Sequence, residues 1–217
     1  MIAQHLPLLN GAHIVLASGS PRRKQILQQL GLTSVEVVAS SFAEDMPHAA
    51  FGGPEEYVVR YATEKANEVN GRLAQRPDLV IGSDTVIALD GRILEKPADA
   101  AGAARMLSSM SGRTHEVWTG VAMVQNRALV GGAAGAGAGL GVVTFAECTS
   151  VTFAELERSA IESYVATGEP LDKAGSYGIQ GMGGSFVTGI VGDYYNVVGF
   201  PLHRFAAELL RLLVPTT

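Results

Sequence analysis

The spacing of hydrophobic residues predicts strands and helices that alternate along the chain. Residues 14–17 form a short apolar run of strand type, and residues 142–153 alternate as a half-buried strand does. Residues 54–74 instead carry apolar side chains at helical spacing. The whole pattern predicts strands at 14–17, 34–39, 79–89, 92–95, 114–124 and 142–153, and helices at 21–30, 54–74, 99–110, 154–166 and 201–213. Alternation of this kind favours an α/β fold, with a mixed β-sheet flanked by helices.

One predicted hairpin bears on the chemistry of the chain. Asp90-Gly91 is a two-residue turn signal that joins a long strand to a short return strand. Ideal pairing across this turn places Lys96 opposite Thr85, level with Asp84 but on the other face of the sheet. A site that holds both Lys96 and Asp84 therefore requires a bulge or an irregular strand end.

The start of the helix at 21–30 carries charges of the wrong sign for a helix N-terminus. Ser20 is a candidate N-cap residue and Pro21 is suited to the first helical position. Arg22, Arg23 and the lysine after them follow directly, although the helix dipole disfavours cations there. Together with the hydroxyls of Ser18 and Ser20, these cations predict a site for a multiply charged anion such as phosphate. The alternative is that the cations point outward and are only solvated.

Two further charged residues stand in apolar surroundings. Lys65 shares the apolar side of the predicted helix with Tyr61 and Val69, so it either finds a buried partner or extends to the surface. Asp84 interrupts the apolar run of a predicted strand. Burying its carboxylate is costly unless a cation or a metal compensates for the charge.

Composition restricts the class of protein. The 217 residues carry a formal net charge of -5, which argues against a nucleic-acid partner. The single cysteine, Cys148, excludes an internal disulfide, fits a reducing compartment, and is expected to be a small core residue. Residues 128–146 lack charge but are rich in glycine, so we expect a flexible Gly/Ala-rich insert at 128–141 between two paired strands, and no membrane span. A soluble protein without a targeting segment is expected.

The remaining candidates for chemistry are separate polar positions that the fold would have to bring together. Glutamine 180 lies in a glycine-dense stretch, residues 171–201, whose backbone can approach a ligand closely. Four cations match the charge of a nucleoside triphosphate, and one or two carboxylates can hold Mg²⁺. The chain contains no GxxxxGK[ST], kinase, HExxH, paired CxxC or GxSxG signature. Hydrolysis by an activated water remains, with Asp84 as the base or a metal ligand; the candidates are Ser18, Ser20, Arg22, Arg23, Glu44, Lys65, Asp84 and Lys96.

Six blocks of the sequence resemble those of the Maf family of nucleoside triphosphate pyrophosphatases. They occur in order across residues 13–213, which we interpret as a single Maf-like domain. The blocks are ASGSPRRKQIL, EEYVVRYATEKA, GSDTVI with LEKP, MLSSMSGRTHEVWTGVA, GEPLDKAGSYGIQG and NVVGFPL.

The resemblance implies a fold similar to inosine triphosphatase, with two lobes and a central cleft. It also implies hydrolysis of a nucleoside triphosphate to the monophosphate and pyrophosphate with Mg²⁺ or another divalent metal such as Mn²⁺, in a cytoplasmic homodimer. By motif, Asp84 matches the catalytic proton acceptor, and Glu44 matches a second acidic position that would bind the metal with Asp84. The phosphate-binding positions are Ser18, Ser20, Arg22, Arg23, Lys65 and Lys96, and the positions linked to base choice are Arg22, Thr85 and Gln180.

The motifs are closer to the branch of the family that acts on dTTP and UTP. The Gln180 amide can accept a hydrogen bond from N3–H and donate one to O4 of uracil or thymine, whereas cytosine presents the reverse pattern. The alternatives are a 7-methyl-GTP pyrophosphatase of the same family and a nucleotide-binding regulator of cell division whose catalysis is vestigial.

Overall fold

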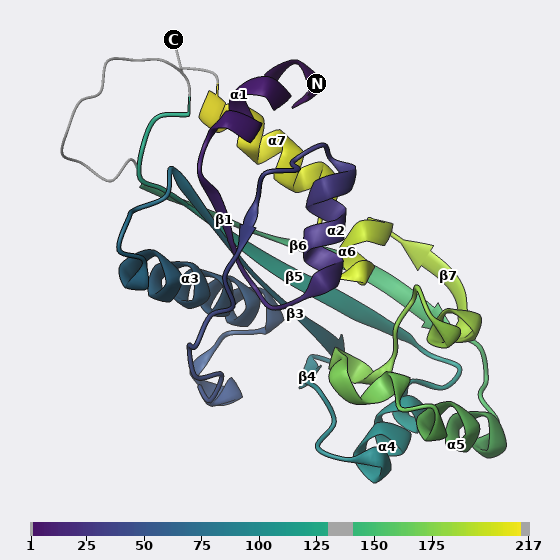
Figure 1. Cartoon of the computed structure of the whole chain (residues 1–217). Coiled ribbons are helices and arrows are strands. Elements are labelled where there is room, and N and C mark those ends of the chain that lie inside the picture. Colours follow the sequence, from purple (N-terminus) through teal and green to yellow (C-terminus); the bar gives the residue numbers. More distant parts are fainter. Residues whose placement is uncertain (1, 130–140, 214–217) are drawn as a thin grey trace.

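The computed structural model describes residues 2–129 and 141–213, so the Gly/Ala-rich insert predicted at 128–141 lies almost entirely outside the described residues. The strands form one seven-stranded mixed sheet in the order β2-β1-β3-β5-β6-β7, and β4 pairs with β3 beside that path (Figure 1). The strands are β1 (Ile14–Ala17), β2 (Glu36–Val37), β3 (Leu79–Leu89), β4 (Arg92–Leu94), β5 (Thr114–Gln125), β6 (Gly141–Phe153) and β7 (Val187–Val191). The helices are α1 (Leu6–Gly11), α2 (Pro21–Gln29), α3 (Pro54–Arg72), α4 (Ala100–Met110), α5 (Arg158–Ala166), α6 (Tyr194–Val198) and α7 (Leu202–Leu213).

The predicted mixed sheet flanked by helices is confirmed. β1 runs parallel to β2 and β3, whereas the other strand pairs are antiparallel. The expected hairpin of β5 and β6 pairs twelve positions, from Thr114 with Thr152 to Gln125 with Gly141. No helix in the described residues has both the length and the apolar character that a membrane crossing needs.

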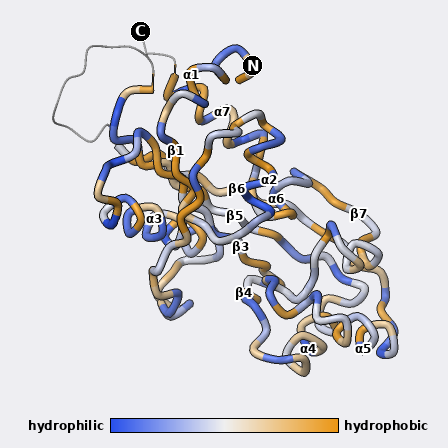
Figure 2. The backbone as a smooth tube through the Cα atoms, in the orientation of Figure 1, coloured by the Kyte–Doolittle hydropathy of each residue, from blue (hydrophilic) through white to orange (hydrophobic). Residues whose placement is uncertain are grey.

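The two faces of the sheet bury different helices. On one face, Ala62 of α3 packs against Val80 of β3. On the other, Leu27 of α2 and Phe205 of α7 pack with Ile81. Figure 1 shows α3 on one side of the sheet and α2 and α7 on the other, and Figure 2 shows that hydrophobic residues concentrate in the central strands. Alternate residues of β3 therefore point toward α3 or toward α2.

Helix α3 lies directly against the sheet at two glycines. A Cβ atom at Gly82 would come within 2.0 Å of the Ala62 carbonyl oxygen, and one at Gly120 within 2.3 Å of the Val58 carbonyl oxygen. Only glycine allows backbone to approach backbone this closely. As a result, the middle of α3, which carries Lys65, lies against β3.

Two apolar clusters occupy the two ends of the sheet. The first contains α2 and α7, and the second contains Leu107 of α4 and Ile161 of α5 packed around Ile87. The main cavity is lined by Ile87 from the second cluster and by Val198 from the first. The cavity therefore lies between two lobes, as expected.

Several predicted boundaries are wrong. The strand expected at 34–39 is reduced to β2, the return strand ends at Leu94 instead of residue 95, and the helix expected from residue 154 begins at Arg158. Before α5, the N-cap residue Glu157 is extended and the Leu156 N–H donates to the Ser111 hydroxyl at 2.7 Å. The hydrophobic pattern does not predict α1, α6 or β7, all of which are short. The elements α6 and β7 also lie in the glycine-dense stretch.

The expectation that Cys148 is a core residue is also wrong. Its side chain is half-buried on β6, beyond the strands that α3 mainly covers. Burial, and then the charges of Glu116 and Glu147, raise the pKa of the thiol to about 11. The thiol is therefore protonated at neutral pH.

His115 gives the fold a pH-dependent stability that can be measured. The side chain is buried, its Nε2 lies 2.9 Å from the Tyr177 hydroxyl, and burial lowers its pKa from 6.5 to about 4. As the pH falls below the ordinary histidine pKa of 6.5, His115 binds a proton in the unfolded chain but not in the folded chain, so the folded state loses stability. The unfolding free energy of the wild type should decrease from pH 8 to pH 5. In His115→Phe this decrease is expected to be smaller by about 2 kcal/mol.

Urea unfolding at the two pH values measures this difference. His203→Gln is the control, because His203 is exposed and its replacement should leave the wild-type dependence. Equal pH dependence in the wild type and in His115→Phe would contradict the assignment.

Candidate functional site

The main cavity lies where one edge of β3 lacks a partner strand. On that edge β3 pairs with β1 at residues 79–82 and with β4 at residues 87–89, whereas the other edge pairs continuously with β5. Residues 83–86 are thus open on one edge within the described part of the chain. Because successive side chains alternate, a gap in a sheet gives one ligand access to both faces. The cavity has a volume of about 600 Å³ and contains Asp84 from one face and Thr85 from the other.

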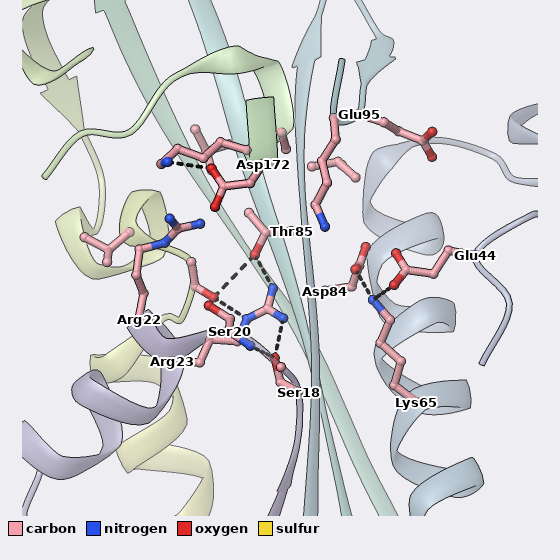
Figure 3. A pocket seen from close by; sticks show the side chains of 18 of the residues that line it. Ser18, Ser20, Arg22, Arg23, Glu44, Lys65, Asp84, Thr85, Glu95 and Asp172 are labelled. Carbon is pink, nitrogen blue, oxygen red and sulfur yellow. Dashed lines mark hydrogen bonds and ion pairs between the residues drawn. The ribbon is translucent and has the colours of Figure 1, made fainter. Parts of the chain in front are cut away.

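On the α3 face, Asp84 forms a buried ion pair with Lys65. The Lys65 Nζ lies 2.7 Å from Asp84 Oδ1, and each side chain is 9% exposed. Nζ also lies 2.9 Å from Glu44 Oε1, so one ammonium joins two carboxylates (Figure 3). Lys65 is therefore not extended to the surface. The pair satisfies the requirement that a buried charge has a partner.

On the opposite face, Arg23 joins three segments of the chain. Its Nε donates to the Gly199 carbonyl at 3.0 Å, and Nη1 donates to the Ser18 hydroxyl at 3.0 Å and to the Ser83 carbonyl at 2.9 Å. Nη2 donates to the Thr85 hydroxyl at 3.0 Å. Protein acceptors thus occupy four of the five guanidinium N–H groups. Arg23 holds the open edge of β3 to the start of α2 and keeps one donor for a ligand.

Arg22 and Lys96 are two further cations of the cavity. Both line it, and the side chains of both lack a hydrogen bond or ion pair to any other residue in ranges 2–129 and 141–213. Arg22 points toward Asp172 (Figure 3). The ladder of β4 ends at Leu94, so Lys96 is not paired opposite Thr85, and it lines the same cavity as Asp84.

The serines at the start of α2 also line the cavity. Ser20 occupies the N-cap position in an extended conformation, as predicted, but its hydroxyl makes no capping hydrogen bond. Its backbone N–H instead donates to the Ser18 hydroxyl at 3.2 Å. The helix start therefore presents Ser20 to the cavity instead of using its side chain as a cap.

Sequence analysis missed several lining residues. Glu95 accepts a hydrogen bond from the Tyr57 hydroxyl, and His48 Nε2 lies 3.0 Å from the same oxygen. Burial opposes the ionisation of Glu95, but His48 and Tyr57 hold its pKa below the ordinary value. On the other side of the cavity, Lys173 Nζ lies 2.7 Å from Asp172 Oδ1. The sequence signals that could have identified these residues are their charges: Glu95 is next to Lys96 in LEKP, and Asp172 and Lys173 precede Gln180 in LDKAG.

The positions linked to base choice do not all meet in one place. Gln180 lines a second, smaller cavity of about 280 Å³ and does not line the main one. Arg22, Lys173 and Tyr177 line both cavities, so the two cavities are neighbours. The Thr85 hydroxyl accepts a hydrogen bond from Arg23 and lies 2.9 Å from the Thr119 hydroxyl.

The two carboxylates around Lys65 suit a hard divalent cation. Mg²⁺ takes oxygen ligands and is held by one or two carboxylates together with substrate phosphates and water. Asp84 uses only Oδ1 toward Lys65, and Glu44 uses only Oε1. The described residues contain no group of three or more His, Cys, Asp or Glu side chains arranged around a metal. A metal held by Asp84 and Glu44 would therefore have to take its other ligands from a bound molecule or from water.

Fold and site together define a mixed α/β protein with an interlobe cleft. The cleft contains two carboxylates bound to one lysine, and two cations that have no partner among the described residues. Residues 13–212 match the model of the family described as "Maf-like protein". The chain belongs to this family.

Three relatives are 43–47% identical to the chain over the aligned residues. A human protein named "Probable bifunctional dTTP/UTP pyrophosphatase/methyltransferase protein" is 47% identical over 93% of this chain, which spans only 32% of the human protein. A Bacillus cytotoxicus protein named "dTTP/UTP pyrophosphatase" is 47% identical over 90% of this chain and 93% of its own length. A Bacillus cereus protein of the same name is 43% identical over 96% and 94%. The solved structure of the Staphylococcus aureus Ham1 protein covers 92% of this chain and 96% of its own, with a TM-score of 0.42 and 15% identity.

Proposed function

We propose that the protein hydrolyses dTTP and UTP to the monophosphate and pyrophosphate. The observation that carries the proposal is the buried contact of Asp84 with Lys65, in one cavity with Ser18, Arg22, Arg23 and Lys96. The names of relatives that are 43–47% identical over at least 90% of the chain support the choice of substrates.

In the proposed reaction, water attacks the α-phosphorus and the bond to the bridging oxygen of the pyrophosphate breaks. Asp84 accepts the proton of the attacking water. Lys65, which donates a hydrogen bond to Oδ1 at 2.7 Å, fixes the orientation of the carboxylate that acts as the base. Arg22 and Lys96 contact the phosphate oxygens and stabilise the charge that grows on the leaving pyrophosphate.

A divalent metal completes the proposal, with Asp84 and Glu44 as its protein ligands. When bound, Mg²⁺ or Mn²⁺ would neutralise phosphate charge and polarise the phosphoryl oxygens. Lys65 already binds both carboxylates and would keep them in place as the substrate enters. A cytoplasmic homodimer is part of the same proposal, and the family resemblance is its support. The net charge of -5 argues against a nucleic acid as the partner.

A nucleotide panel tests the function. Purified protein with Mg²⁺ or Mn²⁺ should release pyrophosphate from UTP and dTTP faster than from CTP, GTP, ATP or 7-methyl-GTP, with one nucleoside monophosphate formed per pyrophosphate. Preference for 7-methyl-GTP would show that the substrate is the methylated purine nucleotide and not a pyrimidine nucleotide. Binding of UTP without UMP formation would instead indicate a sensor, and absence of both would contradict the proposal.

A further inference from the structure

The side chain proposed to read the base depends on the backbone of its loop for its position. Gln180 is exposed, and its amide forms no hydrogen bond within the described ranges 2–129 and 141–213. Its position in the smaller cavity is therefore determined by the backbone of the loop around it, residues 178–184. Four glycines in this loop increase the backbone entropy that must be lost to fix one conformation.

Glu169 anchors this loop from outside it. Its Oε2 accepts from the Met182 N–H at 3.0 Å, and Oε1 accepts from the Gly183 N–H at 3.4 Å. Gly181 packs so closely on the carboxylate that a Cβ there would lie 2.2 Å from Oε1. The carboxylate thus binds the loop directly after Gln180.

Tyr164 anchors the same loop on the other side of Gln180. Its hydroxyl accepts from the Gly178 N–H at 3.2 Å and donates to Glu169 Oε1 at 2.9 Å. The hydroxyl therefore connects the two anchors into one network. Tyr164 itself is buried in the apolar cluster of α4 and α5, so the network is fixed to that lobe.

The anchor also contacts the wall between the two cavities. Lys173 Nζ donates to the Glu169 carbonyl and to Asp172 Oδ1, each at 2.7 Å, and Lys173 lines both cavities. Burial opposes the ionisation of Glu169, but the Met182 N–H, the Tyr164 hydroxyl and the Gly183 N–H hold its pKa below the ordinary value. Glu169 thus remains an anionic acceptor at neutral pH.

We propose that Glu169, with Tyr164, is a positioning residue for base selection: it holds the 178–184 backbone so that Gln180 faces the base of the bound nucleotide. The inference rests on the proposed function and adds to it a residue that would not touch the reacting phosphates. Loss of the anchor should therefore affect the choice between bases and leave the cleavage step largely intact.

The test compares UTP with CTP in single and double variants. Glu169→Ala should lower the ratio of kcat/KM for UTP to that for CTP about tenfold, the effect of one well-placed hydrogen bond, with kcat for saturating UTP almost unchanged. Gln180→Ala should give a similar ratio. In the double variant the ratio should fall no further, because both changes remove the same interaction.

Glu162→Gln is the matched control, because Glu162 is on α5 and its side chain pairs with exposed Arg158. It should keep the wild-type ratio. If Glu169→Ala does not fold, Glu169→Gln and Tyr164→Phe carry the test, because both preserve shape and each removes one acceptor of the network. A wild-type ratio in every folded anchor variant, or additive effects in the double variant, would overturn the inference alone. A wild-type protein that hydrolyses no nucleotide would overturn the proposed function as well.

Discussion

Asp84→Asn is expected to lower kcat for pyrophosphate release from UTP at least about a hundredfold. Asparagine preserves the size of the side chain and an oxygen that can accept from Lys65, but it cannot take a proton from water at neutral pH. The substitution also removes a carboxylate ligand from the proposed metal site. Pyrophosphate release with saturating UTP and Mg²⁺ measures the effect.

The folded state should persist in this variant. Lys65 keeps its ion pair with Glu44 at 2.9 Å, so its ammonium is not left without an anionic partner. A cooperative thermal transition would demonstrate folding. Asp90→Asn is the matched control, because Asp90 is an exposed carboxylate on the β3–β4 turn and asparagine tolerates its φ of 52°. Near-wild-type turnover by Asp84→Asn would refute the role of Asp84 as the base.

The main elements of the fold could be predicted because their residues satisfy local rules. Asp99 illustrates this, since its carboxylate accepts from the Gly102 N–H at 2.6 Å at the predicted start of α4. Gly31, with a φ of 96°, follows α2 at the predicted end of that helix. Such signals depend on a few neighbouring residues. The helix α6 carries the same signals, because the Asp193 carboxylate accepts from the Tyr195 N–H at 2.8 Å and Gly199 follows with a φ of 125°. It was missed because its five residues are too few to show a helical hydrophobic pattern.

The arrangement of the candidate site was predictable only in part. The apolar setting of Lys65 and Asp84 indicated that each needs a partner, but it did not show that they are partners of one another. Their contact depends on the crossing of α3 over β3. The gap in the sheet likewise depends on β1 ending at Ala17 while β3 continues, which involves two segments distant in sequence.

The structure also divides the cations predicted to bind phosphate by what they contact. The sequence does not distinguish Arg22 from Arg23, because both are adjacent charges in the first turn of α2. In the fold, Arg23 donates to four protein acceptors while Arg22 faces both cavities. Successive residues on a helix point in directions about 100° apart, so only the surroundings of α2 decide which arginine is engaged.

The position of α3 itself can be tested through Gly82→Ala, for which we expect a loss of about 1–3 kcal/mol in unfolding free energy and a fall in kcat of about a hundredfold. The added Cβ would lie 2.0 Å from the Ala62 carbonyl oxygen and 3.0 Å from the Ala66 nitrogen. Both are backbone atoms, so the helix must move away from β3. That movement lengthens the 2.7 Å contact between Lys65 and Asp84.

Urea unfolding and pyrophosphate release, measured well below the melting temperature, separate the two effects of Gly82→Ala. Gly71→Ala is the control, because Gly71 is in α3 with no atom within 4 Å of an added Cβ. Its kcat should remain that of the wild type, and its stability should be equal or higher by up to about 1 kcal/mol, since alanine favours the helix. If Gly82→Ala were destabilised but retained wild-type kcat, the close approach of α3 would matter for folding alone. Orientation of Asp84 by Lys65 would then contribute nothing to turnover.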